Sequence, residues 1–466
     1  MKKGDIINLN IESLSYGGLG VAHYDDIVVF VKGGLPGQSV KSKIFKKKKK
    51  YFEAYVLEII KESPDQVQPL CDHFGICGGC SFQNYSYKKQ LTEKQNQIKD
   101  LFSRIAKVKT PKIKSIIGCE DQYYYRNKME FSYSPNRWAL DLESTDNEEH
   151  IDALGLHVKG RFDKIIDINS CHLHGKTSDT IFKFLKKYLI ENKISSFDIK
   201  KRNGYLKNII IREGYQTNEV LINFITTSND NTILSELIQS LTEKFKEIKS
   251  IINTIVKNNS GSSIGEEKIL WGENYINDNI GKYAFKISNN SFFQTNTKQT
   301  EVLYDSIRKI CDLKGDEVVY DLYCGTGSIG IYIAEYVKMV YGVEIVMSAV
   351  IDAIENAQNN NIKNIQFFHG NLIDFFQNNQ ELKLIEKPDL IILDPPRAGI
   401  HQNTLDSILN FNPKKILYVS CNPSTQARDI SILKDSHYVI ENMQPIDMFP
   451  HTPHIENIIL LINNEK

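Results

Sequence analysis

The sequence lacks long apolar runs, and its charges cancel. None of its 466 residues belongs to an apolar stretch of about 20 residues, the length needed to span a bilayer, so we expect no membrane association. The first ten residues, MKKGDIINLN, contain no apolar core typical of a secretory signal, so a reducing, cytoplasmic location is expected. Lys plus Arg and Asp plus Glu each number 57, so net charge indicates no class of partner.

Cysteine is also scarce, with 8 residues in the whole chain. In a reducing compartment these cysteines are metal ligands, nucleophiles or core residues rather than disulfides. The apolar fraction of 41% is ordinary for a soluble protein, and the length suggests about three domains with well-formed cores.

Residues 1–62 predict a small OB-like β-barrel. Short strand patterns separated by Gly-rich turns occur at residues 5–11, 27–31, 39–45 and 52–60. About five short strands in this length are typical of such a barrel.

Lysines crowd one hairpin of this predicted barrel. They occupy positions 41, 43 and 46–50, and Phe45, Tyr51 and Phe52 lie among them. Lysines contact phosphates and aromatic rings stack on bases, so the pattern favours RNA contact. A solvated basic loop is the alternative interpretation.

Three closely spaced cysteines indicate a second kind of site. Cys71, Cys77 and Cys80 surround a Gly pair that lets the backbone turn tightly, and Cys171 follows far downstream. Four thiolates suit zinc and an iron–sulfur cluster equally well, and nearby histidines leave a Cys₃His zinc site open. Buried structural thiols are the remaining alternative.

The predicted secondary-structure pattern of the rest of the chain changes near residue 281. Residues 63–280 predict an α+β domain that includes a helix over residues 87–108. From residue 281 short apolar strands alternate with helices, which predicts a parallel sheet, and a final strand pair suggests an antiparallel edge. The expected domains are therefore residues 1–62, 63–280 and 281–466.

Several strands of the last domain end in polar motifs. The loop at residues 325–330, GTGSIG, follows one strand and opens a helix, and Glu344 ends the next strand, where it could bind ribose hydroxyls. These features fit a nucleotide-like ligand. An NAD site is the rival interpretation, although Asp321 and Asp394 favour S-adenosylmethionine by resemblance to class I methyltransferases.

Two further motifs supply reactive groups to the same sheet edge. Cys421 ends another strand and precedes Asn-Pro, which makes it a candidate nucleophile. The segment FPHTPHIE offers His451, His454 and Glu456 as bases, and a carboxylate in apolar surroundings is a competent base near neutral pH. Core packing of the cysteine and surface exposure of the glutamate are the alternatives.

Taken together, these motifs resemble the RNA uracil-5-methyltransferase family, in its ribosomal-RNA branch. The matching segments are CDHFGICGGC, SFFQTN, DLYCGTGSIG, LDPPRAG, YVSCNPST and DMFPHTPHIE, and the first 62 residues resemble the RNA-binding TRAM domain. The resemblance implies a multidomain enzyme with a TRAM barrel, a central α+β domain with metal-cluster cysteines, and a Rossmann-like class I methyltransferase domain.

The family also implies roles for individual residues. Cys421 would be the nucleophile and Glu456 the proton-abstracting base. The implied contacts to S-adenosylmethionine come from Gln294, Tyr323, Glu344 and Asp394. A [4Fe–4S] cluster would be held by Cys71, Cys77, Cys80 and Cys171. The resemblance also implies that the helix at residues 87–108 packs on the catalytic domain, which would make the domains discontinuous.

The expected reaction is methylation of C5 of a uridine in 23S ribosomal RNA by a cytoplasmic monomer. Carbon C5 of uracil is too weak a nucleophile to accept a methyl group directly, and thiolate attack at C6 removes that obstacle. The target base would be flipped out of its stack. The alternatives are tRNA uridine methylation, an amino-group methyltransferase that uses the Asp-Pro-Pro turn, and a non-catalytic RNA-binding assembly factor.

Overall fold

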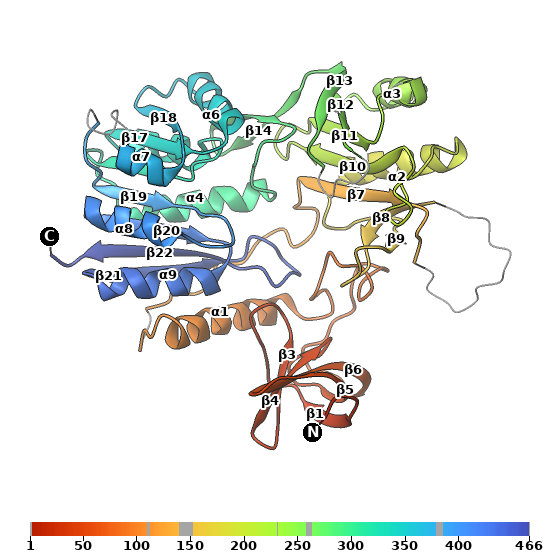
Figure 1. The fold of residues 1–466 in the computed structure, drawn as a ribbon, viewed down its shortest axis with the longest axis horizontal. Helices are drawn as coiled ribbons and strands as arrows, with labels where there is room; N and C mark the ends of the chain where they lie inside the picture. The colour runs from red at the N-terminus through yellow and green to blue at the C-terminus, as the bar shows by residue number, and fades with distance from the viewer. Residues whose placement is uncertain are drawn as a thin grey trace.

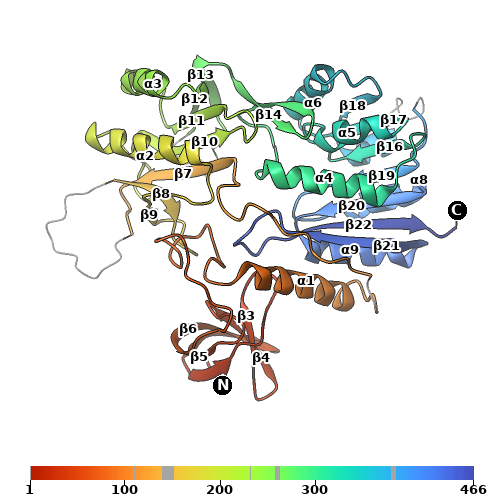
Figure 2. The same ribbon diagram turned by 180° about the vertical axis from the view of Figure 1, so that it is seen from behind.

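The computed structural model describes residues 2–109, 112–138, 152–230, 232–257, 263–378 and 385–465. An N-terminal sheet lies below two larger lobes, and each lobe is built on its own seven-stranded sheet (Figures 1 and 2). None of the helices in these ranges has the length and apolar composition that a bilayer crossing requires.

The N-terminal sheet has six strands in the order β1-β5-β6-β4-β3-β2. Strand β5 has the alternating pattern of a strand with one buried face. Val40, Ser42 and Ile44 are buried, while the intervening Lys41 and Lys43 are exposed. The strands are β1 (Ile6–Asn10), β2 (Ser13–Leu14), β3 (Gly20–Tyr24), β4 (Ile27–Lys32), β5 (Ser39–Lys47) and β6 (Tyr51–Lys61).

The central lobe has a mixed sheet in the order β13-β12-β11-β10-β7-β8-β9. Every residue of β11 is buried, so this strand is covered on both faces. The strands are β7 (Lys128–Ser134), β8 (Ala153–His157), β9 (Ile165–Asp167), β10 (Leu206–Glu213), β11 (Val220–Thr226), β12 (Ile248–Ile255) and β13 (Glu266–Gly272). The helices are α2 (Lys176–Glu191) and α3 (Thr232–Lys244).

The C-terminal lobe has the sheet order β18-β17-β16-β19-β20-β22-β21. The first five strands are parallel and β22 and β21 are antiparallel to their neighbours, so the expected parallel sheet with an antiparallel edge is confirmed. The strands are β16 (Val318–Leu322), β17 (Met339–Glu344), β18 (Ile365–His369), β19 (Leu390–Leu393), β20 (Lys415–Ser420), β21 (Tyr438–Ile446) and β22 (Glu456–Asn463).

Helices flank this sheet on both sides (Figures 1 and 2). They are α4 (Thr297–Cys311), α5 (Ser328–Ile333), α6 (Met347–Asn359), α7 (Leu372–Asn378), α8 (Gln402–Phe411) and α9 (Pro423–Asp435), with a short 3₁₀ turn η1 (Ala334–Tyr336) after α5. A hairpin of β14 (Tyr275–Ile280) and β15 (Tyr283–Ser288) links the two lobes, and the predicted limit between residues 280 and 281 falls in its turn. The division into three domains with limits after residues 62 and 280 stays a prediction.

Helix α1 (Tyr87–Arg104) precedes the central sheet in sequence but packs on the C-terminal lobe, beside α9 (Figure 1). Its Ile98 and Phe102 are fully buried in the same core as Tyr438 and Ile459. The segment after α1 continues along the sheet edge, where Ile113 bridges β21.

The first half of α1 buries polar side chains instead of an apolar stripe. Lys94 forms a buried ion pair with Asp447, with 2.7 Å between Nζ and Oδ1. Asp447 also accepts hydrogen bonds from the Tyr87 hydroxyl and the Phe449 amide, at 2.9 and 3.1 Å. The helix is therefore fixed to the loop at residues 447–455, which leads into β22.

We predict that Lys94→Met destabilises the protein by about 3–5 kcal/mol, because it leaves the Asp447 carboxylate buried without its cation. Urea unfolding followed by circular dichroism measures the loss. The matched control is Lys89→Met on the same helix, since Lys89 pairs with Asp65 near the surface at 3.1 Å. The control should cost less than about 1 kcal/mol. Equal losses in the two variants would contradict the role assigned to the buried pair.

Candidate active site

The sheet order brings the predicted motifs to one edge. Strands β17, β16, β19 and β20 are successive parallel neighbours, so their carboxyl ends lie side by side. Ligands of open α/β sheets bind outside these ends. Glu344, Asp394 and Cys421 therefore share one site, although they are far apart in the sequence.

The Gly turn after β16 is shaped for close approach of a ligand. Tyr323, Gly325 and Gly327 have positive φ angles of 64°, 54° and 75°. A Cβ atom at Gly325 would meet nothing within 4 Å, so space is open above it, and its amide donates to Glu344 Oε2 at 3.0 Å. The second Glu344 oxygen accepts from the Val346 amide at 2.9 Å. The turn and the carboxylate thus form one rigid cradle.

Asp321 lies at the centre of this edge and is fully buried. Its Oδ2 accepts from the Gly330 amide at 3.0 Å, while its Oδ1 has no hydrogen-bond partner among the described residues. Burial and the nearby Asp394 raise the pKa of Asp321 to about 7. Burial also raises the pKa of Asp394 to about 7. An unpaired buried carboxylate oxygen and a neighbouring acid suit a cationic or hydrogen-bond-donating ligand.

Cys421 directly follows β20 and is half-buried. Burial, Glu456 and Asp394 raise the pKa of its thiol to about 11, and the guanidinium of Arg397 opposes this rise through its charge and a hydrogen bond. Arg397 is therefore the side chain that favours the thiolate, the reactive form of cysteine.

Glu456 begins β22 and is only 4% exposed. The register of β20 and β22 pairs Ser420 with Asn457, so Cys421 and Glu456 are the next residues outward on two adjacent strands. Burial and the nearby Asp394 raise the pKa of Glu456 well above its ordinary value. The structure thus brings the candidate nucleophile and the candidate base together.

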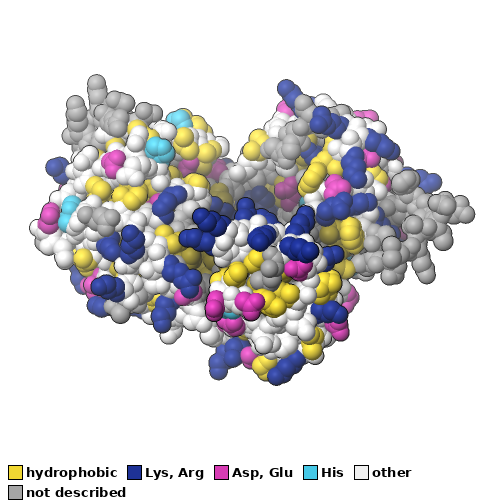
Figure 3. Space-filling view, turned by 60° about the horizontal axis from the view of Figure 1, so that its bottom comes forward, with side chains coloured by type: hydrophobic (Ala, Val, Ile, Leu, Met, Phe, Trp, Pro, Cys, Tyr) yellow, Lys and Arg dark blue, Asp and Glu magenta, His cyan; other side chains and the backbone are white. Residues whose placement is uncertain are grey.

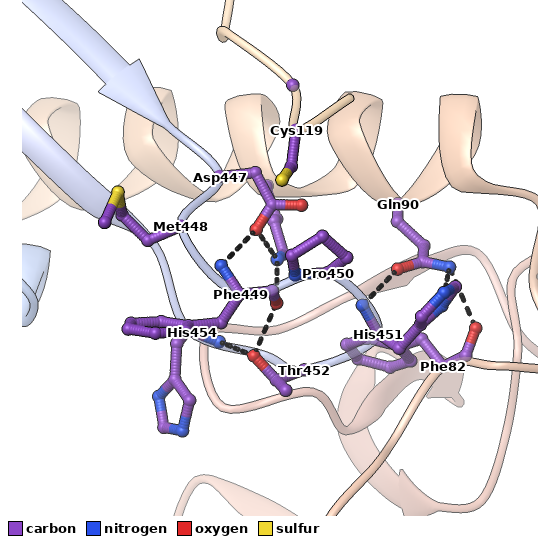
Figure 4. Close-up of polar contacts among 12 residues, drawn as sticks. Phe82, Gln90, Cys119, Asp447, Met448, Phe449, Pro450, His451, Thr452 and His454 are labelled. Atoms are coloured by element: carbon purple, nitrogen blue, oxygen red, sulfur yellow. Dashed lines mark hydrogen bonds and ion pairs between the residues drawn. The ribbon is translucent and has the colours of Figure 1, made fainter. Parts of the chain in front are cut away.

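The two candidate histidines lie differently. His454 approaches Arg397, with 3.5 Å between Nδ1 and Nη2, and burial lowers its pKa to about 4. His451 is buried on the far side of the loop, where its Nδ1 lies 3.2 Å from the Gln90 amide (Figure 4). His451 therefore serves the loop rather than the reacting centre.

The loop at residues 447–455 is held along its length (Figure 4). The His451 carbonyl accepts from the amides of Ser81 and Phe82 at 2.8 and 3.1 Å, and the His451 amide donates to Gln90 Oε1 at 3.1 Å. The Tyr125 hydroxyl donates to the Pro450 carbonyl at 3.1 Å. Helix α1 and the central lobe therefore both position the segment that ends at Glu456.

Gln294 and Tyr323 also lie at this edge of the C-terminal lobe. Gln294 is half-buried between β15 and α4, and its carbonyl accepts from Asn127 Nδ2 at 3.0 Å. Tyr323 is half-buried within the Gly turn, where Thr404 hydrogen-bonds its hydroxyl.

The predicted metal centre is not shown. Among the described residues, no group of three or more His, Cys, Asp or Glu side chains could hold a metal ion. All four predicted ligands nevertheless line one cavity of the central lobe: Cys71, Cys77, Cys80 and Cys171. Gln83 links two of them, because it donates to Cys80 Sγ at 3.2 Å and accepts from the Cys71 amide at 3.1 Å.

Sequence reasoning missed two residues of the site. Arg397 received no role from the sequence, although its charge acts on the Cys421 thiol. Tyr16, from the turn between β2 and β3, donates its hydroxyl to Asn422 Oδ1 at 2.9 Å. A cation next to the Asp-Pro-Pro turn could have been recognised from the sequence, whereas Tyr16 carries no local signal.

The sheet order, the Gly turn and its acidic partner define an S-adenosylmethionine-dependent methyltransferase. Residues 193–464 match the model of the tRNA (Uracil-5-)-methyltransferase family, and residues 1–57 match the TRAM domain. The chain belongs to this family and is an S-adenosylmethionine-dependent RNA methyltransferase. The resemblance to RNA uracil-5-methyltransferases, the TRAM domain and the C-terminal methyltransferase fold are confirmed.

Similar proteins support this assignment over the whole chain. A Porphyromonas gingivalis protein described as an uncharacterized RNA methyltransferase is 36% identical over 98% of this chain and 100% of its own length. One of the same description from Bacteroides thetaiotaomicron is 38% identical over 95% and 98%. The crystal structure of Pyrococcus abyssi tRNA (uracil-54, C5)-methyltransferase with S-adenosyl-L-homocysteine matches with a TM-score of 0.77 and 28% identity, covering 98% of this chain and 100% of that one.

We predict that iodoacetamide alkylates Cys421 slowly at neutral pH and about tenfold faster for each pH unit up to pH 10, because the thiolate fraction grows toward a pKa of about 11. Arg397→Met should slow alkylation severalfold at a given pH, since it removes the stabilising cation. Mass spectrometry of the Cys421 peptide gives the rate. Arg104→Met, an exposed arginine of α1, is the control. A rate independent of pH, or one unchanged in Arg397→Met, would refute this account.

Proposed function

We propose that this enzyme transfers the methyl group of S-adenosylmethionine to C5 of a uridine in RNA through a covalent Cys421–C6 adduct. The observation that carries the proposal is the pairing of Ser420 with Asn457, which places Cys421 beside Glu456 at the cofactor edge of the sheet. A nucleophile and a buried base side by side are what C5 methylation requires.

In this proposal the half-buried Cys421 thiol first loses its proton to solvent, and the guanidinium of Arg397 stabilises the thiolate that forms. The thiolate forms a bond to C6, and the electron pair of the C5–C6 bond moves into the ring as an enolate. S-adenosylmethionine would supply an electrophilic methyl group; C5 bonds to it as the methyl–sulfur bond breaks, and S-adenosylhomocysteine is the leaving group. Glu456 removes the C5 proton, the C5–C6 double bond re-forms, and the C6–S bond breaks to release the thiolate.

The surroundings of Glu456 suit the role of base. Its pKa lies well above the ordinary value because it is buried and faces Asp394, so its carboxylate binds a proton strongly. A general base is most effective when its pKa approaches the working pH. Burial also keeps bulk water from competing for the C5 proton.

We further propose that Gln294, Tyr323, Glu344 and Asp394 hold S-adenosylmethionine. The cradle of Gly325 and Glu344 fits the cofactor's ribose, because a carboxylate accepts from two hydroxyls. The space above Gly325 admits the ligand close to the backbone. In this proposal the Asp394 carboxylate faces the cation that the methyl donor carries, because a buried carboxylate attracts a positive charge.

The surface supports an RNA substrate. Lys and Arg side chains gather around the hollow between the two lobes, above the N-terminal barrel (Figure 3). Such a basic hollow attracts the phosphate backbone without reading sequence. We propose that the RNA lies there, in the cytoplasm, with the target base flipped toward Cys421.

The ribosomal 23S RNA is our first candidate substrate, because the barrel and the cysteine set together resemble the ribosomal-RNA branch. A specific observation favours tRNA as the second candidate. The similar Pyrococcus abyssi tRNA enzyme covers 98% of this chain, including the barrel, so the barrel alone does not distinguish the two RNAs.

We predict that RNA containing 5-fluorouridine forms a covalent complex with the wild-type enzyme and S-adenosylmethionine, because fluorine at C5 cannot be removed as a proton. Cys421→Ala should form none. Glu456→Gln should accumulate the methylated adduct on normal RNA and lose product formation by at least about 10²-fold. Denaturing gel electrophoresis detects each complex.

Transcripts of 23S rRNA and of tRNA, tested side by side, identify the substrate through nucleoside analysis for 5-methyluridine. Equal adduct formation by the wild type and Cys421→Ala would defeat the mechanism. Full activity of Cys421→Ser would instead support an amino-group methyltransferase. Failure of calorimetry to detect S-adenosylmethionine binding would favour a non-catalytic assembly factor.

We also propose that Cys71, Cys77, Cys80 and Cys171 hold a [4Fe–4S] cluster with a structural role. A tetrahedral zinc ion needs its sulfur ligands about 3.8 Å apart. A four-iron cluster is larger than a single zinc ion, and each of its iron atoms binds one cysteine. The sulfur atoms of its cysteines therefore lie farther apart. The observation that supports the proposal is that all four thiols line one cavity, and the resemblance to the family favours a cluster over zinc there.

We predict that protein purified without oxygen is brown and contains about four iron atoms per chain. Cys80→Ser should lose most of the colour and iron, because it removes one corner ligand. Cys311→Ser, a buried cysteine of α4, is the control and should keep both. Visible absorption and metal analysis measure the outcome. A colourless protein with one bound zinc would overturn the cluster assignment.

A further inference from the structure

The turn between β2 and β3 of the TRAM domain extends from the barrel into the catalytic site. Its backbone is closed by hydrogen bonds from the Ser15 amide to the Leu19 carbonyl and from the Gly18 amide to the Ser15 carbonyl, at 2.8 and 2.9 Å. Gly18 has a φ of 84°, and a Cβ atom there would lie 2.8 Å from the Phe82 ring and 3.2 Å from Pro453. The turn therefore packs tightly between the central lobe and the loop that leads to Glu456.

Helix α1 fixes where this turn points. The Leu14 amide, just before the turn, donates to Glu93 Oε2 at 2.7 Å, and the Leu14 carbonyl accepts from Gln97 Nε2 at 3.3 Å. Glu93 and Gln97 are both buried. Since the same helix holds Asp447 through Lys94, the turn and the catalytic loop share one support.

At the tip of the turn, Tyr16 reaches the residue next to the nucleophile. Its hydroxyl donates to Asn422 Oδ1 at 2.9 Å, and its ring is half-buried. Asn422 Nδ2 donates in turn to the Arg397 carbonyl at 2.8 Å, and Asn422 Oδ1 accepts from the Ser424 amide at 3.2 Å. One amide group thus connects the barrel, the Asp-Pro-Pro turn and the start of α9.

We propose that Tyr16 is a positioning residue of the methyltransferase reaction, through which the TRAM domain completes the catalytic site by holding Asn422 and Arg397 beside Cys421. The proposal rests on the function proposed above, in which Cys421 is the nucleophile. It assigns to the TRAM domain a task separate from RNA binding.

The chemistry of the contact explains its effect. Without the Tyr16 hydroxyl, Asn422 Oδ1 keeps only one donor, and the side chain is freer to release the Arg397 carbonyl. The guanidinium of Arg397 would then spend less time beside the thiol, and the thiolate would form less readily.

The test compares Tyr16→Phe with Tyr24→Phe, a matched tyrosine of β3 in the same domain. Tyr16→Phe should lower the single-turnover methylation rate about tenfold, the kinetic equivalent of one lost hydrogen bond. The dissociation constants for RNA and S-adenosylmethionine should stay within twofold. Iodoacetamide alkylation of Cys421 should shift to higher pH, in the direction expected for Arg397→Met, while Tyr24→Phe leaves both measurements unchanged.

A double-mutant cycle decides whether Tyr16 acts through Asn422. Asn422→Ser keeps a helix-capping oxygen but loses the link to Tyr16, so adding Tyr16→Phe should cause no further loss. The proposal would be overturned if the rate losses of Tyr16→Phe and Asn422→Ser multiplied in the double variant. It would also be overturned if the alkylation profile of Tyr16→Phe were identical to that of the wild type. Absence of 5-methyluridine with the wild-type enzyme would refute the proposed function but not the role of Tyr16. The alkylation experiment needs no RNA, so it tests the role of Tyr16 even in that case.

Discussion

The buried ion pair of Lys94 and Asp447 is the constraint on which the arrangement of the active site depends. Two charges that are 2% and 0% exposed persist inside a protein only if they stay paired and hydrogen-bonded. Asp447 meets this demand with the Tyr87 hydroxyl and the Phe449 amide as further donors. Helix α1 and the loop at residues 447–455 can therefore meet in one register only, and Glu456 follows directly from that loop.

The same helix gives the three parts of the chain a common frame. Its buried polar residues bind the barrel through Leu14, and they bind the catalytic loop through Asp447 and His451. The central lobe joins this frame through the amides of Ser81 and Phe82, which follow Cys80 and donate to the His451 carbonyl. A cluster held by Cys80 would thus lie one short segment away from the loop that carries the base, which is consistent with a structural role.

Features of the fold that depend on a local sequence pattern could be predicted. Features that depend on contacts with residues far away in the sequence could not. Strand ends in the C-terminal lobe were readable because apolar runs stop at polar motifs, and parallel neighbours necessarily align those ends. The buried face of α1 could not be identified from apolar residues alone, although Ile98 and Phe102 are buried. Leu91 is only half-buried and Ile105 is 37% exposed, while Gln90, Glu93 and Lys94 are buried. The hydrogen-bond partners of these three polar residues lie at least 79 residues away in the sequence, except that Gln90 also contacts the nearby Phe82 and Tyr85. A local sequence pattern therefore could not reveal that the three residues are buried.

The acidic neighbours of Cys421 explain why its thiolate must be stabilised by a cation from outside its own strand. Burial raises the pKa values of Cys421, Asp394 and Glu456, and the nearby Asp394 raises those of Cys421 and Glu456 further. Forming a thiolate among acids requires a cation close by, and Arg397 supplies one from an exposed turn whose backbone also accepts hydrogen bonds from Thr425 and Arg428 of α9. Asn422 ties down that turn, and Tyr16 ties down Asn422. In the proposed mechanism the reactivity of the cysteine therefore depends on a contact made by the TRAM domain.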